Sequence, residues 1–302
     1  MTAREPGPGH GPSGQAASRR DGHAAAERAL LHRGGVDAAW GNLGLWLPLP
    51  PGAGPPAAAS DEAWPDYASA AAALARAVAA AAGLAPGQRV LAPGCGCGEE
   101  MALWAREFGV AHVLGIERDA QCVVAAPGTA PPAAVECRIG DASRPDVAAA
   151  SFDAVLCVDA AYHLAPRARW LGAMRRALRR GGRLAFTDLV LDRAGAVPGV
   201  RALLLRPVLR LGAAAAGIDA DDLVTPAAAA ARLAAAGFAD VRLERLDEPV
   251  LGGFVRFAAA QTRRLGPDAS SPAWRRVRAT AALIGPCRAA GLGYALLSAT
   301  AA

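Results

Sequence analysis

The sequence predicts an α/β protein with a doubly wound, mostly parallel sheet. Three observations predict this class. Short apolar strands alternate with helical segments between residues 88 and 191, these strands are apolar on both faces, and a glycine-rich loop follows the first of them. Hydrophobic residues make up 53% of the 302 residues, which is enough for a substantial core.

The alternating region accounts for most of the expected elements. An Ala- and Leu-rich helix at residues 66–82 ends at Gly83 and precedes the first strand. Between the second and third strands, residues 118–134 are short and contain prolines, so the helix there is expected to be stunted. The expected strands are residues 88–94, 111–117, 135–142, 152–160 and 183–191, and the expected helices between them are 97–109 and 166–182.

Past the fifth strand the pattern changes. Residues 197–223 form an insertion with apolar residues, three arginines and Pro207, and a helix at 225–238 leads to a strand at 240–250. A last apolar stretch, 291–301, closes the chain. Because no helix of the βαβ type is evident between the last two strands, they are expected to add antiparallel to the sheet edge.

Composition excludes several classes of function. The net charge of +5 comes from scattered arginines without any lysine, and only 5% of residues are aromatic, so a nucleic-acid interface is not expected. No apolar stretch is long enough for stable membrane insertion. The six cysteines lack zinc-site spacing, so no metal is expected, and reduced thiols suit a cytoplasmic protein. Residues 1–38 are predicted to be a disordered N-terminal segment, and organelle targeting by this segment stays an alternative.

The loop in VLAPGCGCGEE, residues 90–100, carries Gly94, Gly96 and Gly98 at alternate positions. A dinucleotide site requires G-x-G-x-x-G, which is absent here. Glu99 and Glu100 would repel a pyrophosphate at this helix start, whereas they suit a cationic ligand without phosphate. The loop therefore favours S-adenosylmethionine, and Cys95 is included in the expected cofactor site.

Further site residues follow the other strands. Glu117, with Arg118 beside it, ends the second strand and is expected to accept from the ribose hydroxyls. Asp141 is expected at the adenine amino group, where Ala142 offers a backbone N–H. The fourth strand leads to four residues expected at the methyl end of the cofactor, because ligands in such sheets bind beyond the carboxyl ends of the strands. They are Val158, Asp159, Tyr162 and His163.

With these motifs in order, the chain resembles the class I S-adenosylmethionine-dependent methyltransferases. Within them it is similar to the small-molecule branch that includes tocopherol, sterol, phosphoethanolamine and sarcosine/dimethylglycine methyltransferases. The matching motifs are VLAPGCGCGEE, LGIE, IGDAS, SFDAVLCVDAAYHL, ALRRGGRLAFTDLVL and LAAAGFADVRLE, which together span about Tyr67 to Leu251. The resemblance implies a seven-stranded sheet with a reversed last strand, a methyltransferase domain over residues 39–302, and a lid insertion at about 193–222.

The resemblance also implies a reaction. A methyl group would pass from the sulfonium to an O, N or C acceptor of a small molecule by in-line displacement, which requires chiefly alignment and exclusion of water. The apolar insertion favours a lipid-like or aromatic acceptor. His163 is a candidate general base and Tyr162 a candidate pocket residue, although a helix cap and ordinary packing are the alternatives. Trp40, Trp46 and Tyr67 either fold over the cofactor or pack as core.

The main departure from the family is Ala92, at a place that usually holds an acid that orients the methionine ammonium. Loss of one charge-assisted contact costs about 1.5–3 kcal/mol, and Glu99 or Glu100 are candidates to compensate. Two alternative functions stay open at this point. One is a degenerate, non-catalytic methyltransferase-fold protein that acts through partners, and the other is an NAD-dependent oxidoreductase.

Overall fold

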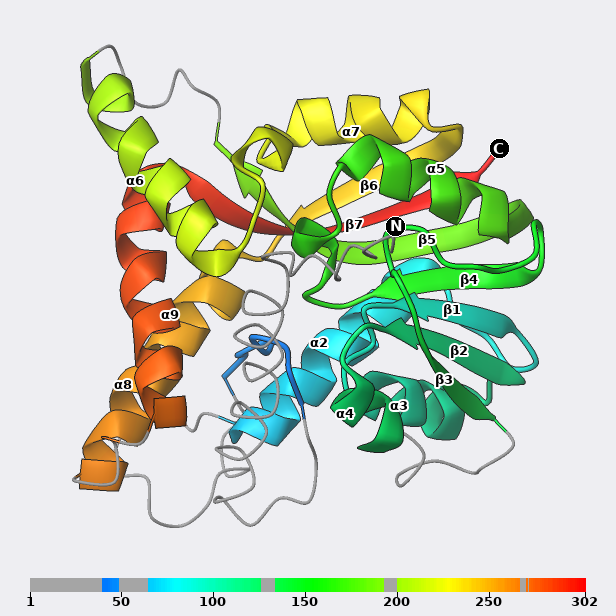
Figure 1. Ribbon diagram of the computed structural model, residues 1–302, viewed down its shortest axis with the longest axis horizontal. Helices are drawn as coiled ribbons and strands as arrows, with labels where there is room; N and C mark the ends of the chain where they lie inside the picture. Colours follow the sequence, from blue (N-terminus) through cyan, green and yellow to red (C-terminus); the bar gives the residue numbers. More distant parts are fainter. Residues whose placement is uncertain (1–39, 49–64, 126–133, 193–199, 267–269, 271) are drawn as a thin grey trace, which may run out of the picture.

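The computed structural model describes residues 40–48, 65–125, 134–192, 200–266, 270 and 272–302. Within them, seven strands form a single sheet in the order β3-β2-β1-β4-β5-β7-β6 (Figure 1). The strands are β1 (Arg89–Pro93), β2 (His112–Glu117), β3 (Val135–Ile139), β4 (Phe152–Cys157), β5 (Leu178–Leu191), β6 (Phe238–Arg245) and β7 (Leu292–Ala301). The doubly wound class and the reversed last strand are confirmed, because β7 pairs antiparallel with both neighbours and the pairs among β1 to β5 are parallel.

The helices begin and end where the local sequence requires. Asp66 caps the first of them by accepting from Ser69 N at 2.8 Å, and Gly83 ends it with φ of 64°. Thr225 and Pro226 open another in the same manner. The α-helices are α2 (Tyr67–Ala82), α3 (Glu99–Phe108), α4 (Ala120–Ala125), α5 (Arg167–Ala177), α6 (Val200–Ala216), α7 (Pro226–Ala235), α8 (Gly253–Leu265) and α9 (Pro272–Ala289), and the shorter helical turns are η2 (Ala161–His163), η3 (Ala220–Asp222) and η4 (Asp247–Gly252).

The last two strands add antiparallel at the sheet edge, as predicted, with β7 between β5 and the edge strand β6. One expectation about the end of the chain is wrong, because residues 253–289 contain two helices, α8 and α9, where no helix was expected. Four arginines in α9, together with Pro286 inside it, dilute the apolar repeat, and the helix is held instead by packing on α6 and α8.

Two smaller expectations differ in extent. The predicted helix over 166–182 ends at Ala177, and the chain enters β5 directly because Leu178 pairs with Phe152. The helix α6 in the insertion continues through Pro207. The stunted helix after β2 is confirmed, because α4 has six residues.

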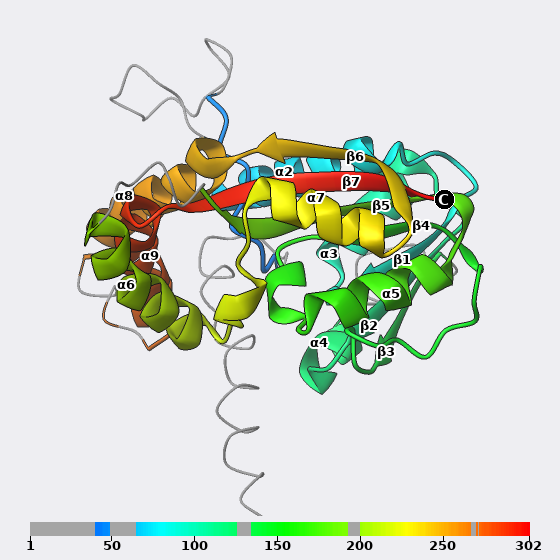
Figure 2. The same ribbon diagram turned by 90° about the horizontal axis from the view of Figure 1, so that it is seen from above.

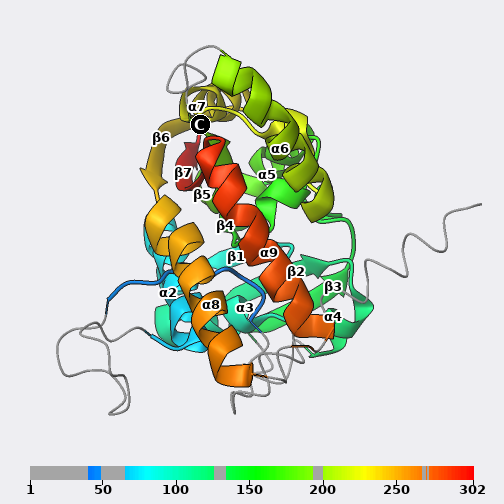
Figure 3. The same cartoon turned by 90° about the vertical axis from the view of Figure 1, so that its left-hand side faces the viewer.

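Helices cover both faces of the sheet (Figure 2). α2 and α3 pack on one face with the core cluster that contains Leu74 and Trp104, and α5 and α7 cover the other with Trp170 and Leu233. α6, α8 and α9 gather beyond the carboxyl ends of the parallel strands, where β5 ends at Leu191 opposite the start of β7 (Figures 1 and 3). This end is where the predicted site residues lie.

Two predictions fall partly or wholly outside the described residues: the disordered segment 1–38, and the first part of the insertion at 193–199. The described part of that insertion packs closely on α9, since a Cβ on Gly212 would lie 2.5 Å from Cys287 Sγ. In the described part of the chain, no helix has both the length and the apolar character needed to cross a membrane.

Candidate active site

The loop between β1 and α3 needs glycine at each of its three alternate positions. Gly94, Gly96 and Gly98 have φ of 72°, 52° and 85°, a region that side chains other than glycine rarely adopt. Gly94 is also closely approached, because a Cβ there would lie 2.6 Å from the Cβ of Ala160. The loop after β1 and the loop after β4 therefore touch at this point, which closes one end of the crevice.

Glu117 connects the end of β2 to this loop. One carboxylate oxygen accepts from the backbone N–H of Gly96 at 3.1 Å, and the other accepts from Arg118 at 2.9 Å and Asp119 at 3.0 Å. The Arg118 side chain is exposed and takes part here through its backbone. The arrangement fixes the carboxylate at the strand end and leaves part of its acceptor capacity for a ligand.

Asp141 follows β3 in a tight turn. Its carboxylate accepts from the hydroxyl of Ser143 at 2.6 Å and from the Ser143 backbone N–H at 2.8 Å. The hydroxyl bond, with the backbone bond, lowers the pKa of Asp141 although the side chain is exposed. The neighbouring Ala142 is buried.

Four thiols surround the glycine loop in two pairs. Cys95 Sγ lies 3.4 Å from Cys137 Sγ on β3, and Cys97 Sγ lies 3.2 Å from Cys122 Sγ on α4. All six cysteines are free, and the hydrogen bond to Cys137 and burial together raise the pKa of the Cys95 thiol. In the described residues, no group of three or more His, Cys, Asp or Glu side chains could hold a metal ion.

Asp159 is the most connected side chain of the site. It has φ of 50°, and its carboxylate accepts from the Leu43 backbone N–H, from Tyr162 OH at 3.2 Å and from Tyr294 OH. Its own N–H donates to Thr187 Oγ1 at 2.8 Å. Burial raises the pKa of Asp159, and these donors oppose the rise. One carboxylate thus joins the segment 40–48, the turn after β4 and β7.

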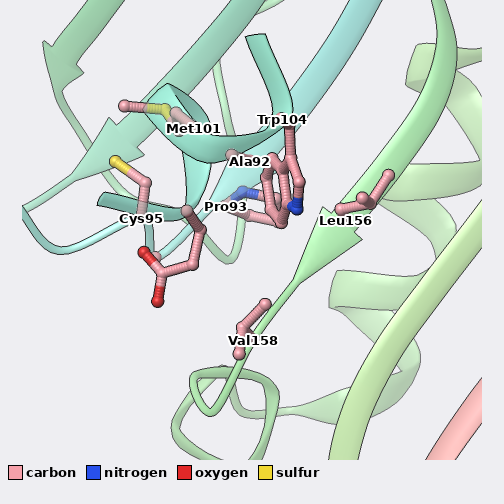
Figure 4. A pocket seen from close by; sticks show the side chains of 9 residues that line it. Ala92, Pro93, Cys95, Met101, Trp104, Leu156 and Val158 are labelled. Carbon is pink, nitrogen blue, oxygen red and sulfur yellow. The ribbon is translucent and has the colours of Figure 1, made fainter. Parts of the chain in front are cut away.

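A cavity lies between the ends of β1 and β4 and the N-terminal part of α3 (Figure 4). Its volume, including the part that is open to solvent, is about 200 Å³, and its lining is Ala92, Pro93, Gly94, Cys95, Glu100, Met101, Trp104, Leu156 and Val158. Among these described residues the one charged side chain is Glu100. Burial raises the pKa of Glu100 to about 7, which its hydrogen bond from Asn42 Nδ2 at 3.2 Å only partly opposes.

The N-terminal aromatics pack instead of projecting into this cavity. Trp46 and Tyr67 both stack on Phe257 of α8, with ring centroids 4.8 Å and 5.4 Å away, and Trp40 and Trp46 are buried. Tyr67 OH donates to the Asn42 carbonyl at 2.6 Å. The packing alternative therefore describes these rings, and the segment reaches the site through Asn42 and the backbone of Leu43.

The two predicted catalytic residues stand side by side on η2. The rings of Tyr162 and His163 meet edge to face with centroids 4.6 Å apart, and His163 is exposed. Tyr162 is fixed by its hydrogen bond to Asp159. The turn therefore presents an imidazole next to the carboxyl end of β4.

Below η2 lies a charged network. Arg167 Nη2 pairs with Asp188 Oδ1 at 2.9 Å, with side-chain exposures of 5% and 10%, and Arg167 also donates to the Ala161 carbonyl. Asp222 of η3 accepts from the Arg167 backbone at 2.9 Å and from Arg232 at 3.0 Å. Burial raises the pKa of Asp188 to about 6. The network holds η2 and the end of the insertion against β5.

Sequence reasoning did not place Asn42, Leu43, Thr187 or Tyr294 at the site. Tyr294 lies 135 residues after Asp159, and no motif marks it. It arrives because β7 is inserted next to β5 with Tyr294 opposite Leu189. The one available signal was an aromatic hydroxyl in a final strand whose other polar side chains are Ser298 and Thr300.

Comparison with known proteins agrees with this geometry. Residues 91–186 match a family model described as a methyltransferase domain. The erythromycin 3''-O-methyltransferase of Saccharopolyspora erythraea is 28% identical over 73% of this chain and 68% of its own length. Among solved structures, a sarcosine dimethylglycine methyltransferase homologue from Galdieria sulphuraria superposes with a TM-score of 0.69 at 16% identity, over 92% of this chain and 98% of that one. The [4+2]-cyclase SpnF superposes with a TM-score of 0.67 at 22% identity, over 95% and 94%.

Residues 91–186 are therefore a methyltransferase domain, and the sheet has the topology expected of the class I methyltransferases. The motifs and the matched methyltransferase domain agree on S-adenosylmethionine as the cofactor, and the nicotinamide alternative is set aside. The residues present fit this cofactor. The described cavity lining carries a carboxylate and no basic side chain, which suits a sulfonium and an ammonium and would repel a pyrophosphate.

Proposed function

We propose that the protein transfers a methyl group from S-adenosylmethionine to a hydroxyl oxygen of a small molecule. The observation that carries the proposal is the exposed His163 on η2, the turn after β4, which Asp159 holds through Tyr162. A hydroxyl acceptor must lose its proton during transfer, and an imidazole is suited to take it. The similarity to an O-methyltransferase that acts on erythromycin supports an oxygen acceptor.

The residues divide this work between binding and alignment. We assign the adenosyl part of the cofactor to the glycine loop, Glu117, Asp141 and the Ala142 backbone, all at strand ends. When bound, S-adenosylmethionine supplies an electrophilic methyl group whose leaving group is already cationic. His163 then accepts the proton of the hydroxyl, Tyr162 fixes the direction of approach, and α6 with η3 is proposed as a lid that excludes water.

The first experiment tests cofactor and acceptor separately. Calorimetry with S-adenosylmethionine, S-adenosylhomocysteine and NAD is expected to show binding of the first two alone. Label transfer from methyl-labelled cofactor to a panel of sugar hydroxyls, phenols, amines and lipid-like alcohols is then expected to favour hydroxyl compounds. Transfer to amines alone would refute the oxygen acceptor. Absence of S-adenosylmethionine binding would favour the degenerate, partner-dependent alternative.

The second experiment tests the proton acceptor. His163→Ala is expected to lower kcat by about 10²–10⁴-fold while the affinity for S-adenosylmethionine stays within about twofold. Tyr162→Phe is the matched comparison, since it keeps the ring that faces His163 and removes the bond to Asp159. If His163→Ala keeps wild-type kcat on the best hydroxyl acceptor, the role assigned to His163 is wrong.

A further inference from the structure

We infer that the Glu100 carboxylate binds the amino group of the methionine part of S-adenosylmethionine and so replaces the acid that is missing at Ala92. The inference rests on the proposed function, because it assigns one contact within the same cofactor site. On this inference, alanine at position 92 does not mean that the cofactor site lacks an acid for the ammonium. The acid has moved from the end of β1 to the first turn of α3.

Geometry places both residues at one cavity. Ala92 lies near the end of β1, is 2% exposed, and lines the cavity together with Glu100, the second residue of α3. Alanine at this position brings no carboxylate to the cavity. Glu100, in the first turn of α3, is the charged side chain among the described residues that line it.

Charge indicates a cation at this place. Glu100 is close enough to Asp159 and Glu99 for their charges to repel its own. Glu100 accepts hydrogen bonds from its own backbone N–H and from the neutral side chain of Asn42, whereas the Asp159 carboxylate receives three donors. Burying a carboxylate beside like charges is unfavourable, and a cationic ligand in the cavity would offset that cost.

The chemistry of the carboxylate selects which cation. Glu100 keeps acceptor lone pairs that Asn42 does not use, and an ammonium carries three N–H donors that can fill them. A sulfonium has no donor and would gain only Coulomb attraction. The ammonium is therefore the partner that gains a charge-assisted hydrogen bond from Glu100.

The test compares ligands that differ in the amino acid part. S-Adenosylmethionine and S-adenosylhomocysteine both carry the ammonium, whereas 5'-methylthioadenosine lacks it and keeps the adenosyl group. Glu100→Gln is expected to weaken the first two by about 10- to 100-fold in calorimetry, which is the loss of one charge-assisted contact, and the third by less than about threefold. Glu107→Gln is the control, since this exposed residue of the same helix pairs with Arg76 away from the cavity.

The outcomes separate this inference from the proposed function. If wild-type protein fails to bind S-adenosylmethionine, the proposed function itself is wrong. If wild-type protein binds and Glu100→Gln binds equally well, or weakens all three ligands alike, or weakens S-adenosylmethionine alone, the inference about the ammonium is overturned.

A second variant keeps the test decisive where Glu100→Gln folds poorly. The double variant Ala92→Glu/Glu100→Gln has the wild-type charge, with the carboxylate returned to β1. It is expected to recover S-adenosylhomocysteine affinity to within about threefold of wild type, because the ammonium again meets an acid in the same cavity. A folded double variant that stays as weak as Glu100→Gln would overturn the inference.

Discussion

Glu100→Gln is expected to stabilise the ligand-free protein at pH 8 although it weakens cofactor binding. Burial, with smaller contributions from the charges of Glu99 and Asp159, raises the pKa of Glu100 from 4.5 to about 7 against the opposing bonds from its own backbone N–H and from Asn42. Because the folded state holds this proton more tightly than the unfolded state, stability falls as the pH rises from about 4.5 to about 7. Glutamine carries no charge and escapes this loss.

The magnitude follows from the two pKa values. A pKa of about 7 in place of 4.5 corresponds to about 3 kcal/mol, and since the side chain keeps some exposure we expect about 1.5–3 kcal/mol at pH 8. At 2–4 °C per kcal/mol, Tm of the variant should exceed that of wild type by about 3–12 °C at pH 8. The difference should shrink as the pH is lowered to 5.

The assay is thermal and urea unfolding of ligand-free protein at pH 5, 6.5 and 8. Glu107→Gln serves as the control. Because Arg76 lowers the pKa of Glu107, removing this charge is not expected to stabilise the protein at pH 8. A Glu100→Gln protein that is less stable than wild type at pH 8, or whose advantage does not depend on pH, would refute the reasoning. Saturating S-adenosylmethionine should reduce the advantage, since it stabilises wild type more.

Three further predictions concern other contacts of the site. Glu117→Ala leaves three backbone N–H groups of the loop without their acceptor, so calorimetry should show S-adenosylmethionine affinity at least about tenfold lower; an unchanged affinity contradicts this. Tyr294→Phe removes a hydrogen bond to the Asp159 carboxylate and should lower the free energy of unfolding, measured in urea, by about 1.5–3 kcal/mol; a decrease of less than about 0.5 kcal/mol would contradict this. Arg167→Met leaves Asp188 buried without its cation and should cost about 3–5 kcal/mol, whereas Arg167→Met with Asp188→Leu should cost less; equal losses would show that the pair is not the cause.

The sequence was sufficient to predict those elements whose conformation depends on neighbouring residues. The strand and glycine pattern around Gly94 and Gly96 predicted a cationic cofactor, because positive φ and the helix start are properties of consecutive residues. The helix over 66–82 was also predictable from its caps. The helices α8 and α9 were not, since their stability depends on packing against α2, α6 and the segment 40–48 through rings such as Phe257.

The hydrogen-bond network of Asp159 could be predicted from the sequence only in part. The motif after β4 marked the residue, but its partners come from positions 43 and 294, separated from it by more than a hundred residues. No spacing in the sequence predicts that register. Asn42, which donates to Glu100, was missed for the same reason.

By itself, the sequence determined the sheet class, the cofactor and the order of the motifs, since each depends on neighbouring residues and on strands that end at one common edge. Tertiary structure alone decided where β7 enters the sheet, which rings pack as core, and that Glu100 and Ala92 line one cavity. These depend on contacts between distant segments, whose free energies are set by burial and charge in the folded chain and not by any local pattern.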